Sequence, residues 1–284
     1  MKKLLQYYQI ICNLSLDVIM GVCCSMLVLP VCLNIELPEI WYIALPLSTW
    51  TIYLTDHLID VFRNKDEYPT PRHQFIKKYS REIIFLIIFL CATLLYLLID
   101  QFDIKILIIG IALLSIVILH FIIVRINPLK KLLINNKEFA VASIYAIGIY
   151  LAPLLVLFEN DNNILVPIIS FLIFLTLAFI NLLMVSIIEI DNDKKMGNSS
   201  WVIAISQTRA QNILYGLFIG IFFVIIFTIP FADDKIKFLL LSYQFIALGH
   251  FIIFSFRKNL LHFLAYRKLS EILFWVPALV YFFI

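Results

Sequence analysis

The chain has 284 residues, of which 63% are apolar and only 14% are charged, and its formal net charge at pH 7 is +3. Soluble globular proteins contain about 45–50% apolar and about 25% charged residues, and the mean hydropathy of +0.99 shows the same imbalance. This composition excludes a soluble enzyme, a disordered segment and a nucleic-acid-binding module, and it indicates an all-α integral membrane protein.

Apolar stretches long enough to cross a bilayer follow one another along the whole chain. A hydrocarbon core requires about 20 apolar residues per helix, and lipid offers no partner to an unpaired backbone group, so each span must be a continuous helix. The chain contains nine such stretches. The predicted spans are residues 9–33, 39–61, 82–99, 104–124, 138–158, 164–188, 211–231, 236–255 and 260–283.

The ninth span is interrupted in its first half by Arg267, Lys268 and Glu271. Two interpretations are open for this region. Either a short helix begins near Leu269, or an amphipathic turn leads into the span.

The basic residues predict the orientation of the spans. If the N-terminus is cytoplasmic, 19 of the 22 Lys and Arg residues lie in cytoplasmic segments, and only Lys105, Lys235 and Lys237 lie outside. This asymmetry is what the positive-inside rule expects. The sequence therefore predicts an N-in, C-out topology in which the chemistry lies at the cytoplasmic face, since the longer polar loops are also on that side.

Two cytoplasmic helix ends concentrate acidic residues. Asp56 and Asp60 end the second span, and Glu189 and Asp193 end the sixth, each pair spaced i, i+4. Residues at this spacing share one helical face, where two like charges are unfavourable without a bridging cation. Mg²⁺ is usually held by one or two carboxylates together with substrate phosphates. Such acids at a membrane boundary are also often merely solvated, but two equally spaced pairs on one side favour a magnesium site.

At these residues the chain resembles the UbiA superfamily of intramembrane prenyltransferases, which have nine transmembrane helices and aspartate-rich motifs after helices two and six. Asp56 and Asp60 match the last two acids of N-D-x-x-D-x-x-x-D. The second motif, D-x-x-D-x-x-x-D-[RK]-x-x-G, is matched in its later positions by Glu189, Asp193, Lys194 and Gly197. The departures are Ile52 and Tyr53 in the first motif, and Ser186 with a Glu at position 189 in the second.

The resemblance implies a single UbiA-like domain over residues 1–284, with the nine helices bundled around a central cavity open to the cytoplasmic face. It implies that an isoprenyl diphosphate binds through Mg²⁺ held by four catalytic acids, namely Asp56, Asp60, Glu189 and Asp193. The expected partners of the diphosphate are Arg63, Arg72, Lys130, Lys137 and Lys194, and the expected acceptor pocket contains Asn13, Asp17 and Tyr53.

Other polar residues carry alternative interpretations. His57 lies between the acids of the first pair and, on helical spacing, faces away from both. Residues 69–73 form a turn-rich loop that either closes over the site or simply connects two helices. Lys130, Lys137 and Glu138 precede the fifth span, where attraction to anionic lipid also explains basic residues. Asp17, His120 and His250 lie within spans, and the two histidines suit packing better than metal binding.

These observations favour a Mg²⁺-dependent prenyltransferase of the membrane, in a bacterium the inner membrane. The enzyme would move an isoprenyl group to a lipophilic, including aromatic, acceptor. One alternative keeps the site and cyclises the prenyl diphosphate without an acceptor. The other alternative is a non-catalytic membrane scaffold or a transporter. The expected partners are the two substrates and membrane lipid, with no nucleic acid.

Overall fold

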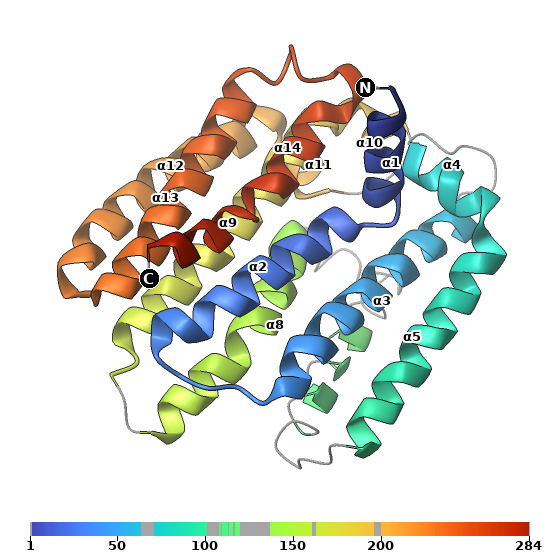
Figure 1. The fold of residues 1–284 in the computed structure, drawn as a ribbon. Coiled ribbons are helices and arrows are strands. Elements are labelled where there is room, and N and C mark those ends of the chain that lie inside the picture. Colours follow the sequence, from blue (N-terminus) through green and yellow to red (C-terminus); the bar gives the residue numbers. More distant parts are fainter. Residues whose placement is uncertain are drawn as a thin grey trace. The chain divides into compact units, whose positions relative to one another are not determined.

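The computed structural model describes residues 2–63, 71–100, 137–160, 163–195 and 200–283, with scattered residues between 108 and 119. Within these ranges every regular element is a helix, as Figure 1 shows. Among the described residues, six helices are long and apolar enough to cross a membrane. They are residues Leu16–Leu33, Ser80–Ile99, Lys137–Glu159, Leu165–Ile188, Gln207–Phe231 and Asp234–Ser255. The all-α prediction is thereby confirmed, and the apolar helices are compatible with an integral membrane protein.

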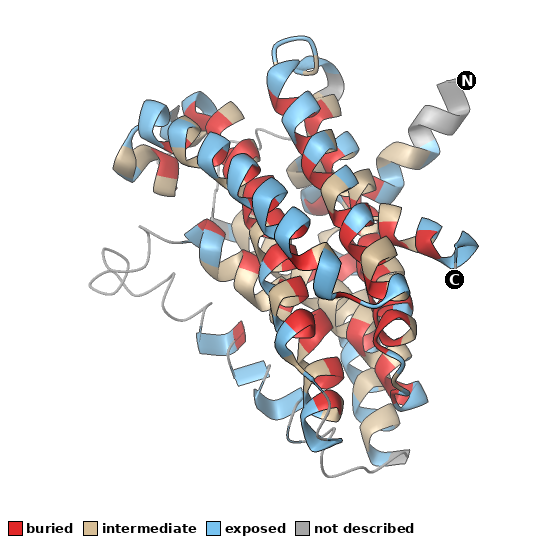
Figure 2. Cartoon of the chain, turned by 90° about the vertical axis from the view of Figure 1, so that its left-hand side faces the viewer, coloured by how far each residue is buried: buried red, intermediate tan, exposed pale blue. Residues whose placement is uncertain are grey.

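The chain divides into two compact units, and helix α2 (Leu16–Leu33) contributes to both. Unit 1 comprises Met1–Cys23 and Pro38–Leu107, and unit 2 comprises Cys24–Leu37 and Ile108–Ile284. In each unit, buried residues run as stripes along the helices, and exposed residues run along their other sides (Figure 2). For a helix in lipid the exposed side remains apolar, as it does on α5 and α12 with Phe85, Phe89, Phe223 and Phe227.

Unit 1 is built around α3 (Glu39–Arg63), which packs against α5 (Ser80–Asp100) and the short α4 (Pro71–Lys78). Helix α1 (Lys2–Asn13) also contacts α4. The last turns of α3 place an apolar residue at every third or fourth position, which forms one continuous helical face. This face joins residues of α4 and α5 in a buried cluster made of Leu54, Leu58, Val61, Ile76, Ile83 and Leu90.

In unit 2, α9 (Leu165–Ile188) contacts α8 (Lys137–Glu159), α12 (Gln207–Thr228), α13 (Asp234–Ser255) and α14 (Ala265–Leu273). The fully buried Phe174 of α9 lies among aromatic rings of the neighbouring elements. Its ring centroid is 5.6 Å from those of Tyr150 and Tyr243 and 6.0 Å from that of Phe274. Ring pairs at such distances add to the stability that burial provides. These aromatic residues therefore form the centre of the unit.

Three hydroxyl groups meet inside this aromatic core. The hydroxyl of Tyr150 on α8 lies 2.8 Å from that of Ser170 on α9 and 2.6 Å from that of Tyr243 on α13. All three residues are buried. Because an unpaired polar group is costly in an apolar environment, the three hydroxyls satisfy one another and join three helices.

The first predicted span is wrong as a single helix. The structure divides residues 9–33 between α1 and α2, and Ser15 at the break has a positive φ of 58°. The break frees the carbonyl of Leu14, which accepts a 2.9 Å hydrogen bond from the indole N–H of Trp50. The side chain from α3 thus compensates the loss of a helical hydrogen bond.

The ninth predicted span, residues 260–283, is also not one continuous α-helix. It consists of a 3₁₀ turn (η3, His262–Leu264), the nine-residue α14, and a 3₁₀ segment (η4, Val276–Phe282). At about 1.5 Å per residue, α14 is too short to cross a bilayer. The interpretation that an amphipathic turn opens this region is closest to the structure.

The remaining elements complete the comparison with the predicted spans. Helix α3 covers the second span, residues 39–61, although its polar end keeps it out of the six apolar helices. The fourth span, residues 104–124, lies largely outside the described residues. Short helices occupy the connections in unit 2, namely α10 (Ile190–Lys195), α11 (Trp201–Ile205) and η2 (Ile229–Phe231).

Candidate functional site

The polar end of α3 carries the first predicted acid pair. The apolar face described above is buried against α4 and α5. Asp56, His57 and Asp60 lie between those apolar positions and are half-buried. The packing of one face therefore holds the polar residues of the other in place at the start of α4.

Helix α4 brings further polar residues to this end. One ligand atom each from His57, Asp60 and His73 lie within 4.8 Å of one another. Nη1 of Arg72 donates to Nε2 of His57 over 3.2 Å. The expectation that His57 faces away from both acids is therefore wrong for Asp60. The side chain leans toward α4 because its partners, Arg72 and His73, are there.

The electrostatic setting of Asp60 differs from that of a bare helix end. A carboxylate at the C-terminus of α3 opposes that helix dipole, whereas the first turn of α4 favours a negative charge. His73 lies in this first turn, and Arg72 adds a full positive charge beside the group. Asp60 therefore lies beside the first turn of α4 as well as at the C-terminal end of α3.

The second acid pair has a different environment, in unit 2. Glu189 is the C-cap residue of α9. Both of its oxygens accept hydrogen bonds from Arg267, Oε1 from Nε and Oε2 from Nη2, at 2.6 Å each. The hydroxyl of Tyr266 also donates to Oε1. Glu189 is therefore paired with a guanidinium, whose positive charge opposes the binding of a metal ion at this carboxylate.

Helix α14 lies along the end of α9 and supplies these partners. Near one end of the contact Nδ2 of Asn181 donates to Oε1 of Glu271 over 3.2 Å, and near the other Glu189 pairs with Arg267. The order of the two contacts shows that α14 runs antiparallel to α9. Tyr266 is only 1% exposed. Burial, reinforced by the neighbouring Glu189 carboxylate, raises the pKa of Tyr266, so this hydroxyl remains a donor at neutral pH.

The other residues of the second motif lie on α10. Asp193 is half-buried, and its backbone N–H donates to the carbonyl of Glu189 over 3.0 Å. Asp191 and Lys194 are exposed. Gly197 lies outside the described residues. The helical turn from Glu189 to Asp193 is therefore present, but the Glu189 carboxylate is held by α14.

Glu138 is a polar residue of this region that the sequence analysis treated only as part of a loop. It lies in the first turn of α8 and is 8% exposed. Its carboxylate accepts a 2.8 Å hydrogen bond from the hydroxyl of Ser186 and 3.2 Å contacts from the backbone N–H of Trp201. The sequence feature that indicates this role is an acidic residue at the very start of an apolar span, because a carboxylate needs hydrogen-bond partners when it is buried there.

The residues predicted for the acceptor pocket lie in unit 1. Asn13 ends α1 and accepts a 3.1 Å hydrogen bond from Gln9. Asp17 is 1% exposed and lies in the first turn of α2, not two turns into a longer helix as its position in the predicted span implied. The N-terminal end of a helix favours a carboxylate, and Oδ1 of Asp17 accepts a 3.1 Å hydrogen bond from the backbone N–H of Val18. Tyr53 is half-buried, with its ring 6.3 Å from that of His57.

Of the cations predicted to contact diphosphate, Arg72 is the one whose contact within the site is described. Arg63 is the last residue of α3, and its side chain is outside the described part. Lys130 also lies outside the described residues. Lys137 begins α8 and is exposed, as is Lys194. These two lysines are in unit 2, whereas Arg72 is in unit 1.

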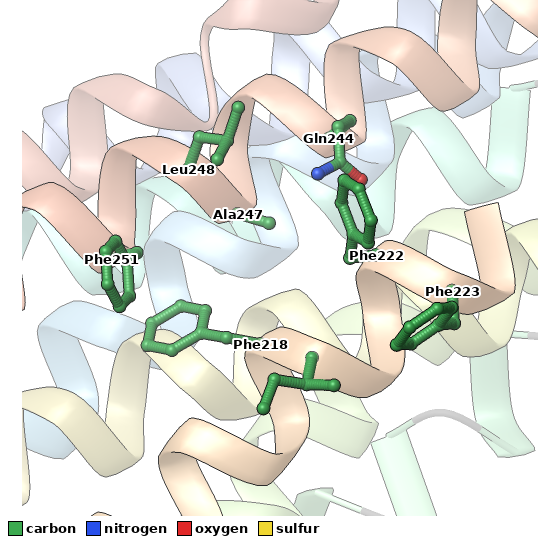
Figure 3. A pocket seen from close by; sticks show the side chains of 8 residues that line it. Phe218, Phe222, Phe223, Gln244, Ala247, Leu248 and Phe251 are labelled. Carbon is green, nitrogen blue, oxygen red and sulfur yellow. The ribbon is translucent and has the colours of Figure 1, made fainter. Parts of the chain in front are cut away.

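A groove on unit 2 runs between α12 and α13 (Figure 3). Its lining residues are Phe218, Ile219, Phe222, Phe223, Gln244, Ala247, Leu248 and Phe251. Gln244 is its single polar residue, and none of its residues ionises. The groove is therefore unsuited to diphosphate chemistry, and its apolar lining is compatible with a surface that faces lipid.

The two acid pairs thus belong to different units, Asp56 and Asp60 to unit 1 and Glu189 and Asp193 to unit 2. A common cavity lined by both pairs remains a prediction. Comparison with known proteins adds no relative: no protein family model, no curated protein and no solved structure matches this chain.

Proposed function

We propose that the chain is a multi-span prenyltransferase of the membrane with a cytoplasmic N-terminus, which transfers an isoprenyl group from its diphosphate to a lipophilic acceptor at the cytoplasmic face. The observation that supports the proposal most is the polar end of α3. Here Asp56 and Asp60 lie one turn apart on α3, and the α4 guanidinium of Arg72 contacts His57 between them. Carboxylates for a divalent cation beside an arginine for phosphate oxygens suit a phosphate ester.

The donor set at this end fits Mg²⁺, which prefers oxygen ligands. Asp56 and Asp60 of unit 1 would hold the ion. When bound, Mg²⁺ neutralises charge that develops on a departing diphosphate. Arg72 would orient the phosphate oxygens, because a guanidinium donates two parallel hydrogen bonds to such groups. In unit 2, the ion pair between Glu189 and Arg267 holds the end of α9 against α14.

The direct test is transfer of a radiolabelled prenyl group by purified protein across several lipophilic acceptors. We expect Asp56→Asn and Asp60→Asn to abolish transfer, because each removes a full charge without changing side-chain size. Asp191→Asn is the matched control, since Asp191 is exposed on α10. Transfer that survives both α3 substitutions would contradict the proposal. Cyclised products formed without any acceptor would instead identify a terpene cyclase that uses the same site.

A second candidate function is a non-catalytic membrane scaffold. The observation that favours it is the ion pair of Glu189 with Arg267, because a guanidinium beside this carboxylate opposes the binding of a cation there. Thermal unfolding distinguishes the two functions. An enzyme of the proposed type is stabilised by a prenyl diphosphate only when Mg²⁺ is present, since a ligand that binds the folded state raises its stability. A scaffold shows no shift at millimolar ligand.

A further inference from the structure

The group formed by His57, Asp60 and His73 has a chemistry that the magnesium proposal does not use. We infer that these three residues form a binding site for a divalent transition-metal ion, with Zn²⁺ as the reference ion. The group lies entirely within unit 1, so its geometry depends only on α3 and α4. The inference concerns metal binding alone and does not depend on the proposed transferase activity.

The identity of the donors points to a transition metal. Two imidazoles and one carboxylate are a ligand set that proteins use for Zn²⁺ with an open fourth position. Imidazole suits Zn²⁺, Cu²⁺, Fe²⁺ and Ni²⁺, whereas Mg²⁺ prefers oxygen ligands. The chain has only five histidines, and two of them, separated by 16 positions in the sequence, meet here.

The distances permit coordination after a small movement. Ligand atoms about 2.1 Å from a tetrahedral Zn²⁺ ion are about 3.4 Å from one another, and here they lie within 4.8 Å. Rotation of half-buried side chains closes such a difference without moving a helix. Ile76 is fully buried against α3, one turn beyond His73 on α4. This packing keeps His73 beside the polar edge of α3.

Arg72 sets the strength of the site. Its guanidinium occupies Nε2 of His57, and its positive charge repels a divalent cation nearby. An incoming ion that uses this nitrogen displaces Arg72, which then becomes available to an anion such as phosphate. We therefore expect Arg72→Gln to strengthen Zn²⁺ binding by about tenfold, which corresponds to the repulsion between charges about 5 Å apart at high effective dielectric constant.

The experiment is a Zn²⁺ titration of the full-length protein in detergent, with any polyhistidine tag removed and a chromogenic chelator as competitor. We expect one equivalent of Zn²⁺ in the wild type. His57→Ala and His73→Ala should each weaken binding by more than the about 10–100-fold that loss of an outer-shell partner costs. His262→Ala is the matched control, because His262 is an exposed histidine elsewhere in the chain, and it should bind as the wild type does.

Two further measurements distinguish loss of the metal site from loss of folding. Gel filtration and circular dichroism report whether each variant folds, and His73→Gln replaces His73→Ala if the latter does not. Co²⁺ substitution gives the visible absorption of a tetrahedral site, which the histidine variants should lose. Absence of stoichiometric Zn²⁺ in the wild type, or unchanged affinity in folded histidine variants, overturns the inference.

Asp60 belongs to both proposed sites, whereas Asp56 belongs only to the magnesium site and therefore distinguishes this inference from the proposed function. Asp56→Asn should abolish Mg²⁺-dependent stabilisation by prenyl diphosphate and leave Zn²⁺ binding intact. Loss of prenyl transfer with retained Zn²⁺ binding would leave the metal site standing. Failure of Zn²⁺ binding with retained transfer would remove the metal site alone.

Discussion

The ion pair between Glu189 and Arg267 can be measured directly by a double-mutant cycle. The three proteins needed beside the wild type are Glu189→Gln, Arg267→Gln and the double variant. Glutamine keeps most of the side-chain volume and removes the charge, so the cycle isolates the interaction between the two residues. Thermal or denaturant unfolding in detergent micelles, followed by the near-ultraviolet signal of the aromatic core, gives the free energies.

The structure sets the expected magnitude. Two unit charges 2.6 Å apart attract by about 6 kcal/mol at an effective dielectric constant of about 20. Desolvation offsets much of this attraction. The Arg267 side chain is 35% exposed, so solvent screens it further, whereas that of Glu189 is 13% exposed. Each of the two charge-assisted hydrogen bonds contributes about 1.5–3 kcal/mol when it is unscreened. After desolvation and solvent screening are subtracted, we expect a net coupling energy of about 2 kcal/mol.

The sign of each single variant follows from the same contacts. Among the described contacts, Arg267→Gln leaves the mostly buried carboxylate of Glu189 with the neutral hydroxyl of Tyr266 as its donor, so it should be the more destabilising change. Tyr266→Phe provides the control for this hydroxyl, since it retains the ring and the salt bridge. A coupling energy below about 0.5 kcal/mol, within the range of exposed surface pairs, would refute the conclusion that this pair fixes α14 to α9.

Three further predictions concern stability and use thermal unfolding in the same micelles. Gly249→Ala should destabilise the protein by about 1 kcal/mol, because the new Cβ would lie 2.5 Å from a methyl carbon of Leu273. Gly220→Ala is the control: its Cβ meets nothing within 4 Å, so stability should stay equal or rise. Tyr150→Phe should cost about 0.6–1.7 kcal/mol, the range for hydrogen bonds between membrane helices, and equal stability would show that the hydroxyl contacts contribute nothing. Glu138→Ala should cost about 1–3 kcal/mol because it removes the acceptor of the buried Ser186 hydroxyl and of the partly buried Trp201 N–H. A loss below about 0.5 kcal/mol would contradict that role.

The positions of the apolar helices could be predicted from the sequence because the bilayer demands length and hydropathy, which are local properties. Residues 164–188 and 236–255, for example, match Leu165–Ile188 and Asp234–Ser255 to within two residues at each end. The break at Ser15 could not be predicted, because the apolar character continues through it. What stabilises the break is the indole of Trp50, a partner 36 positions away that becomes a neighbour only on folding.

In the candidate site, too, features set by neighbouring residues could be predicted from the sequence, whereas contacts between distant residues could not. The spacing of Asp56 and Asp60 is a local pattern and correctly placed both on one helix. The partners of Glu189 could not be predicted, since Arg267 is 78 positions further along the chain and was assigned to an interrupted span. Helical spacing on α3 alone also misplaced His57, because the side chain responds to Arg72 of another helix.

The three hydroxyls in the aromatic core of unit 2 fix the position of their helices along the helix axes. A residue added to α8 before Tyr150 would turn that side chain by about 100° and displace it by about 1.5 Å, which would take its hydroxyl out of reach of both Ser170 and Tyr243. A slide of any one helix by a full turn of about 5.4 Å would leave buried hydroxyls without partners. Apolar contacts tolerate small slips, whereas this group permits only one alignment of α8, α9 and α13.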